Sequence, residues 1–208
     1  MADDLVAGPD GALRCGWVSS LEDYRGYHDE EWGRPVHGDA ALYERVVLEG
    51  FQSGLSWLTI LRKRPAFRAA FAGFDPEAVA AFDDADVTRL LGDAGIVRHR
   101  RKIEAAITNA RATMRLLDRD GAGGLDALVW SHAPVDPGSG PTRLADLPAQ
   151  TPASRALAQA LKAEGFVFVG PTTAYATMQA CGVVNDHLVG CAYRDGGEHR
   201  PRSQHRLG

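Results

Sequence analysis

The sequence predicts an all-α protein, and three observations carry this prediction. Alternation of apolar and polar residues with a period of two, which is typical of half-buried strands, is almost absent. Helix start and stop signals recur throughout the chain instead. The composition, 45% hydrophobic and 24% charged over 208 residues, is that of a globular protein of one or at most two domains. We expect a single domain over residues 12–194, with flexible segments at 1–11 and 195–208.

The first predicted helices follow an aromatic N-terminal stretch. Asp39 can cap a helix that Gly50 ends, because a side-chain oxygen satisfies the free N–H groups at a helix start and glycine adopts the left-handed conformation at its end. The apolar residues of this helix share one face: Leu42, Val46 and Val47. A second helix is predicted from SGLSWLTILRKR at 53–64, whose final cations suit the negative end of a helix dipole.

The middle of the chain predicts three more helices. Asp75-Pro76-Glu77 combines a cap, a proline at the first helical position and an acid in the first turn. The helix after it should turn two residues inward: Val79 and Phe82. A short helix then carries Val87, Leu90 and Leu91, and it breaks at the sequence GDAG, residues 92–95. A long helix follows from about Arg98 to Leu117, with these residues on its apolar period: Ile103, Ile107, Ala110 and Met114.

The last third of the chain begins with loops. Residues 120–152 are rich in Gly, Pro, Asp and Ser around one short apolar piece, LDALVWSH. Thr151-Pro152 then opens a helix that Gly165 ends. FVFVG at 166–170 is the one β-like run, and its isolation favours a lone extended segment over a sheet. TTAYATMQACG at 172–182 predicts the final full helix.

The length of the apolar runs and the number of cysteines exclude several protein classes. No apolar run reaches the roughly 18–20 residues of a membrane span, and the acidic start lacks the apolar core of a signal peptide, so we expect a cytoplasmic protein without a membrane partner. The three cysteines, Cys15, Cys181 and Cys191, are too few for a disulfide framework and indicate reduced thiols used for packing or metal binding. Cys181 fits a small buried hydrophobe.

Charge limits the role of nucleic acid without excluding it. The net charge of -4 and the isoelectric point near 6.0 argue against a protein that coats nucleic acid, because such binding needs many phosphate contacts. Two basic clusters remain, RKR at 62–64 and RHRRK at 98–102. By charge alone, a solvated helix face is the favoured interpretation of both.

Two cysteines and two histidines gather near the ends of the chain. Cys15 and His28 lie in an N-terminal stretch that is unusually rich in Trp and Tyr, and His187 and Cys191 lie one helical turn apart near the C-terminal end. Two Cys with two His are the right number and softness for a closed tetrahedral zinc site, which would be structural because no position stays open for water. The spacing alone leaves burial of these residues in the core as the alternative.

Two further segments carry chemistry. Residues 90–110 hold two helices around a short glycine-containing turn with basic residues after it, and such a helix-hairpin-helix can bind a DNA phosphate through backbone N–H groups. In the segment 47–64, Glu49 lies among apolar residues and Trp57 follows a flexible turn. A buried carboxylate is costly without a partner, whereas a Glu on the exposed side of its helix is the plain alternative.

Seven motifs together resemble one enzyme family, in order and over about residues 13–193: RCGW, YHDEEWG, LEGFQSGLSW, DAGIVRHRRKI, FVFVG, MQACGVVNDH and HLVGC. The chain is similar to the DNA-3-methyladenine glycosylase I family. The resemblance implies the helix-hairpin-helix DNA glycosylase fold, with the hairpin at about 86–110, and a monofunctional hydrolase that removes 3-methyladenine from double-stranded DNA without cutting the strand. It also implies a monomer and one structural zinc ion, bound by Cys15, His28, His187 and Cys191.

The resemblance also implies roles for single residues. Glu49 would be the catalytic residue and would accept hydrogen bonds from the flipped base, while aromatic residues shape and line its pocket: Trp17, Tyr24, Tyr27, Trp32 and Trp57. An anionic Glu beside aromatic rings favours a cationic methylated base over neutral adenine. Ser53, Gly54 and Leu55 would fill the gap left by the nucleotide. The DNA backbone would be held by the hairpin: Gly95, Arg98, Arg101 and Lys102.

No aspartate is assigned to activate water. Many enzymes of the wider superfamily have one beyond the hairpin, but this family lacks it at the matching place, so Asp118, Asp120 and Asp126 receive no role. Two other functions compete with the glycosylase. A DNA-binding module without activity would not need the carboxylate and its rings, and a zinc hydrolase would need an open coordination position.

Overall fold

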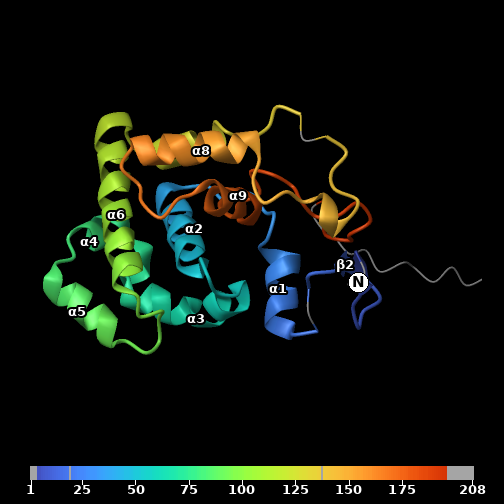
Figure 1. Ribbon diagram of the computed structural model, residues 1–208, viewed down its shortest axis with the longest axis horizontal. Coiled ribbons are helices and arrows are strands. Elements are labelled where there is room, and N and C mark those ends of the chain that lie inside the picture. Colours follow the sequence, from blue (N-terminus) through green and yellow to red (C-terminus); the bar gives the residue numbers. More distant parts are fainter. Residues whose placement is uncertain (1–3, 19, 137, 196–208) are drawn as a thin grey trace, which may run out of the picture.

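The computed structural model describes residues 4–18, 20–136 and 138–195. It is mostly helical, as predicted, and Figure 1 shows its helices packed around the central helix α2. The elements are, in chain order, β1 (Leu5–Ala7), β2 (Leu13–Cys15), α1 (Glu22–Glu30), α2 (Asp39–Gln52), α3 (Trp57–Ala70), the 3-10 turn η1 (Ala72–Phe74), α4 (Pro76–Ala80), α5 (Asp84–Gly92), α6 (Arg100–Asp120), α7 (Gly124–Trp130), the 3-10 turn η2 (Leu144–Asp146), α8 (Pro152–Ala163) and α9 (Pro171–Ala180). No helix in these ranges is long and apolar enough to cross a membrane.

Helix α2 is buried on nearly every side because it packs against α3, α6, α7 and α9. The hydroxyl of Tyr43 donates a hydrogen bond to the carbonyl of Ala106 on α6, which satisfies a polar group deep in the core. Gly50 does not end this helix, as the sequence indicated. It lies inside α2, which continues to Gln52, and it faces the backbone of Phe168 at close range.

Asp39 caps a different helix from the one expected. Its carboxylate accepts hydrogen bonds from the amides of Gly123 and Leu125 at the start of α7, at 2.7 and 2.8 Å. In return, the carboxylate of Asp126 on α7 accepts from the amide of Gly38 at the start of α2. The two helix starts therefore exchange carboxylates, a long-range pairing that a local sequence pattern cannot reveal.

The α3–α6 region largely follows the predictions. Asp75 caps α4 and Val79 is fully buried, but Phe82 lies beyond the end of α4 and is only partly buried. The basic residues 62–64 are wrongly placed by the sequence at a helix end, because α3 continues through Pro65 to Ala70. Helices α5 and α6 are joined by residues 93–99, as expected for a short turn between two helices.

The small antiparallel hairpin of β1 and β2 has no counterpart in the predicted elements. Its first strand pairs Leu5 with Cys15, so the described fold begins before residue 12. The predicted lone segment 166–170 forms no strand; the side chain of Asn109 instead bonds to both the N–H and the C=O of Val167, at 2.8 and 3.1 Å. Of the predicted tail, only residue 195 lies among the described residues.

Candidate active site

A cavity of about 230 Å³ opens between α1, α2, α3 and α9. This volume is below the roughly 300–1,000 Å³ of pockets for drug-sized ligands and fits a single small ring system. All six residues predicted to contact a base line it: Trp17, Tyr24, Tyr27, Trp32, Glu49 and Trp57. Four further lining residues were missed by the sequence analysis: Gln52, Leu147, Ala176 and Gln179.

Aromatic rings form most of the cavity wall. Trp17 lies edge-on to Trp32 and Tyr24, with ring centroids 4.9 and 5.4 Å apart, and Tyr27 is tilted against Trp57 at 5.2 Å. Burial and the nearby Glu49 carboxyl raise the pKa of Tyr27 well above its usual range, so its hydroxyl keeps its proton and can donate a hydrogen bond. The cavity is therefore suited to a flat, electron-poor ring.

Glu49 is the acidic group of the cavity. Its side chain is 5% exposed and has no hydrogen-bond partner among the described residues. Burial raises its pKa from 4.5 to about 8, because the charged form loses its water. The indole Nε1 of Trp57 is likewise buried without a partner. An acidic group without an ion pair and a buried indole N–H without an acceptor lie in one small cavity, which indicates a ligand that pairs with both.

Arg45, the arginine nearest to this carboxyl in the sequence, lowers the pKa of Glu49 by its charge but forms no ion pair with it among the described residues. Arg45 lies one helical turn before Glu49 on α2, but its guanidinium donates to Glu31 at 3.0 Å. Arg64 on α3 donates to both oxygens of the same carboxylate, at 2.6 and 2.7 Å. Glu31 therefore binds both arginines, and Glu49 has no ion-pair partner in the part of the chain that the structure describes.

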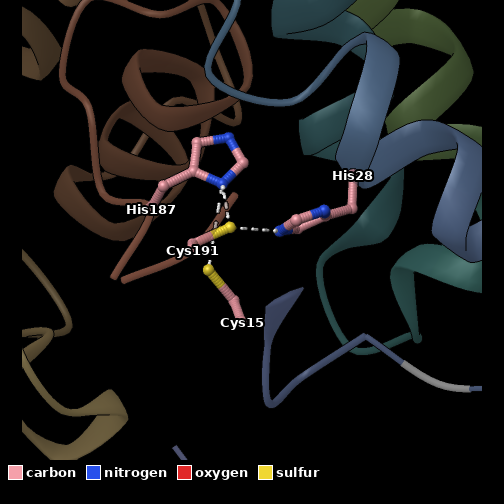
Figure 2. A group of neighbouring side chains, drawn as sticks. All are labelled: Cys15, His28, His187 and Cys191. Atoms are coloured by element: carbon pink, nitrogen blue, oxygen red, sulfur yellow. Dashed lines mark hydrogen bonds between the residues drawn. The ribbon is translucent and has the colours of Figure 1, made fainter. Parts of the chain in front are cut away.

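The four predicted metal ligands come together at the join between the two ends of the chain (Figure 2). All are buried, and their ligand atoms lie within 4.8 Å of one another: Cys15, His28, His187 and Cys191. The Sγ atom of Cys191 is 3.5 Å from Nδ1 of His187 and 3.6 Å from Nε2 of His28. Cys181 is fully buried and lies outside this group, as expected.

The surroundings of both histidines fix which ring nitrogen is free. Nδ1 of His28 bonds to the carboxylate of Asp29 at 2.7 Å, and Nε2 of His187 bonds to the carbonyl of Trp32 at 3.0 Å. Both partners only accept, so these nitrogens carry the protons and the opposite nitrogens face the cysteines with free lone pairs. Arg14 in turn binds Asp29 through Nε and a terminal nitrogen. This donor set could hold a metal ion.

The thiols of Cys15 and Cys191 interact with each other. A hydrogen bond from the Cys15 thiol lowers the pKa of the Cys191 thiol, and the same contact together with burial raises the pKa of Cys15. The amide of Leu188 also donates to Sγ of Cys15 at 3.3 Å. The thiolate is the form of cysteine that binds metal.

Residues of α3 contact the turn between α5 and α6. A side chain at Gly95 would meet Ala66 and Asp93 at 2.9 Å, so the backbone there requires glycine. The ammonium group of Lys63 on α3 donates to the carbonyls of Ala94 and Gly95, at 2.9 and 3.1 Å. The flanking residues 62 and 64 are ion-paired to Asp23 and Glu31. The 62–64 cluster therefore stabilises the fold and is not a free basic surface.

The basic residues of the second cluster, 98–102, differ in their exposure. Arg98 and Arg101 are exposed and have no ion pair among the described residues. Lys102 is 8% exposed, and its ammonium group donates to the carbonyl of Phe51 at 2.9 Å and to that of Ser53. The lysine is predicted to hold a DNA phosphate, and these two carbonyls use two of the three N–H donors of its ammonium group. It fixes the C-terminal end of α2 and the exposed loop that follows.

Replacing Lys102 by Met is expected to destabilise the protein by about 1–3 kcal/mol, because the buried carbonyl of Phe51 loses its donor. At this chain length each kcal/mol lowers Tm by about 2–4 °C, so thermal unfolding measures the effect. Arg101→Met is the matched control from the same helical turn. It should leave Tm within about 1 °C. Equal Tm values for the two variants would contradict the bridging role of Lys102.

Known proteins are similar to this chain along most of its length. Residues 17–195 match the family model described as methyladenine glycosylase. DNA-3-methyladenine glycosylase 1 of Escherichia coli (strain K12) is 51% identical over 179 residues, which cover 86% of this chain and 95% of that protein.

Solved structures have the same fold. A crystal structure of 3-methyladenine DNA glycosylase I superposes with a TM-score of 0.81 at 50% identity, covering 86% of this chain and 97% of that one. A variant of a 3-methyladenine DNA glycosylase I in complex with 3-methyladenine gives a TM-score of 0.80 at 32% identity, with 86% and 95% covered. The cavity, its buried carboxyl and these matches together show that the chain belongs to the methyladenine glycosylase family.

Proposed function

We propose that this protein removes 3-methyladenine from alkylated double-stranded DNA by hydrolysing the N-glycosidic bond, and that it acts as a monomer. One observation carries the proposal: an acidic side chain without an ion-pair partner among the described residues lies buried in an aromatic cavity of single-base size. Methylation at N3 makes adenine a cation, which Glu49 and the surrounding ring faces favour over neutral adenine. The named relatives, and a related structure with 3-methyladenine bound, support the same substrate.

Binding of the flipped base is the main contribution of the protein to this reaction. The nucleotide leaves the base stack and its base enters the cavity, where Glu49 accepts hydrogen bonds from the base edge and Tyr27 shapes the same edge. The positive charge on the base has already weakened the glycosidic bond. As the bond breaks, its electron pair neutralises the base, water adds to C1′ of the sugar, and one proton is released. Free 3-methyladenine and an abasic site in an intact strand are the products.

A base-release assay tests this directly. Methylated duplex DNA is incubated with the protein, and the released bases are separated and identified. We expect free 3-methyladenine together with strands that stay unbroken before alkali treatment. A DNA-binding module without activity would release no base, and a strand break at the lesion would contradict the monofunctional assignment.

We also propose that the Cys2His2 group binds one zinc ion. The observation that supports it is the proton arrangement: each histidine turns a lone pair toward the two cysteines while its other nitrogen is held by an acceptor. Zn²⁺ bound by four protein ligands has no open position for water, so the ion is structural and joins the N- and C-terminal segments. A zinc hydrolase is disfavoured by the same closed donor set.

The turn at 93–99 and the N-terminal end of α6 are proposed to hold the DNA backbone, with Arg98 and Arg101 as free cations. Ser53, Gly54 and Leu55, which are exposed in the loop bound by Lys102, are proposed to occupy the space of the flipped nucleotide. Gly95 contributes by its shape, since only glycine fits the turn there. This surface would bind DNA without reading its sequence.

Changing both Arg98 and Arg101 to Gln is expected to weaken DNA binding equally for all sequences. The slope of log K against log salt should become shallower by about 1 for each lost phosphate contact. Binding isotherms at several salt concentrations measure this. Arg62→Gln is the control, because that exposed arginine is paired with Asp23 and its loss should leave the slope unchanged. An altered base preference in the double variant would count against the assignment.

A further inference from the structure

Gln179 presents a fixed group to the cavity. This α9 residue lines the cavity, and its amide nitrogen donates to Oδ2 of Asp186 at 2.8 Å. The same oxygen accepts a hydrogen bond from the hydroxyl of Tyr175. A carboxylate oxygen can only accept, so the NH2 end of the Gln179 amide must lie on the Asp186 side. One N–H of the amide is used by Asp186, and the carbonyl oxygen Oε1 has no hydrogen-bond partner among the described residues.

The second amide of the cavity differs in this respect. The side chain of Gln52 has no hydrogen-bond partner among the described residues, so it can turn either its NH2 or its carbonyl toward a ligand. Glu49, when ionised, can only accept. The cavity thus contains one adaptable amide and two acceptors, and one of these, Gln179, is held in place from outside the cavity by Asp186 and Tyr175.

A fixed acceptor distinguishes bases that charge cannot separate. 3-Methyladenine and 3-methylguanine in DNA are both cations, so an acidic aromatic cavity attracts both. Their edges differ at position 6, where adenine has an amino donor and guanine has a carbonyl acceptor. An acceptor that cannot turn pairs with the amino group and faces the carbonyl without a hydrogen bond, and a site built around a hydrogen bond rejects the base that lacks it.

We propose that Gln179 is a specificity-determining residue, whose carbonyl oxygen selects bases with a 6-amino group over bases with a 6-carbonyl group. The proposal rests on the proposed glycosylase function and names the substrate class of that site. Tyr175 and Asp186 act through Gln179 by keeping its amide in one orientation. A purely structural role for the three side chains predicts altered stability without a change in preference between the two kinds of base.

The test compares two lesions in one DNA sample. Duplex DNA methylated at N3 of both adenine and guanine is treated with the wild-type protein, with Gln179→Met and with the control Gln52→Met. For each protein, the rate of 3-methyladenine release is divided by the rate of 3-methylguanine release. We expect the ratio to fall about tenfold in Gln179→Met, mainly through slower release of 3-methyladenine. Gln52→Met should keep the wild-type ratio. An unchanged ratio in Gln179→Met would overturn the proposal while leaving the glycosylase function intact.

A second measurement uses only the wild-type protein, so its outcome does not depend on whether a variant folds. Free 3-methyladenine and free 3-methylhypoxanthine, which has a carbonyl in place of the 6-amino group, are compared as ligands of the wild-type protein by competition binding. We expect 3-methyladenine to bind at least about tenfold more tightly. Equal affinities would overturn the inference. Failure of the wild-type protein to release any 3-methyladenine from DNA would instead refute the proposed function.

Discussion

Replacing Glu49 by Gln is expected to lower kcat/KM for 3-methyladenine release by about 100-fold. The variant keeps the size of the side chain but loses the charge that pairs with the cationic base, and hydrogen bonds to charged groups contribute about 1.5–3 kcal/mol. Base-release kinetics under single-turnover conditions measure the loss. Unchanged excision in this variant would remove Glu49 from the mechanism.

The same substitution is expected to stabilise the protein at neutral and alkaline pH. In the unfolded chain the carboxyl ionises near its ordinary pKa of 4.5, whereas in the folded chain burial raises that pKa to about 8. Between these values the unfolded state releases a proton that the folded state keeps, so the carboxyl costs stability as pH rises and the cost is complete above pH 8. We expect Glu49→Gln to gain about 4 kcal/mol at pH 8 and nothing near pH 4.

Thermal unfolding from pH 4 to 8 tests this, with a rise in Tm of about 2–4 °C per kcal/mol. Glu77→Gln is the control, because Glu77 is exposed at the start of α4. Activity should show the opposite dependence: kcat/KM of the wild type rises toward pH 8 as Glu49 ionises, and the variant lacks this rise. A variant less stable than the wild type at pH 8 would show that the carboxyl has a partner in the folded protein.

The proposed zinc ion is expected to be required for folding, so its removal should unfold the protein. Zinc binding to a closed Cys2His2 site is worth about 10–16 kcal/mol in small domains, which equals or exceeds the roughly 5–15 kcal/mol stability of a typical domain. Cys191→Ala should therefore bind no stoichiometric zinc and lose most of its helical circular dichroism at 37 °C. Chelator titration of the wild type should remove metal, helicity and activity together.

Cys181→Ala is the matched control, since this buried cysteine lies outside the metal group. It should retain one zinc ion per chain and lose only the packing contribution of a sulfur atom. Two outcomes would contradict a structural ion. One is full metal content in Cys191→Ala, and the other is chelation that abolishes activity while Tm stays the same.

Local patterns predicted much of this protein because they reflect local physics. Asp75 caps the helix that its sequence context indicates, and the helices on both sides of the 93–99 turn are where periodicity predicts them. The cavity walls and metal ligands were assigned by resemblance, and the structure brings both sets together. A family motif retains such positions even when the residues are far apart in the chain.

Two of the differences from the sequence predictions have one cause, which is a partner distant in sequence. The sequence pattern predicts that Lys102 is a surface cation. In the structure, its ammonium group donates to the carbonyls of Phe51 and Ser53. Asp39 reads as a local cap although it serves α7. Gln179 lies on a helix that the sequence assigns to the core, and helical periodicity does not reveal that Asp186, seven positions later, fixes its amide. Tertiary contacts decide such roles.

The position of the metal ligands along the chain has a consequence for biosynthesis. Cys15 and His187 are separated by 172 positions, so the early half of the site waits for almost the entire chain to leave the ribosome. The indole rings of Trp17 and Trp32 pack against His28 and His187, with centroids 5.1 and 4.6 Å apart. Trp32 therefore lacks this packing partner until the chain has been synthesised as far as His187, and that wall of the cavity is completed only then.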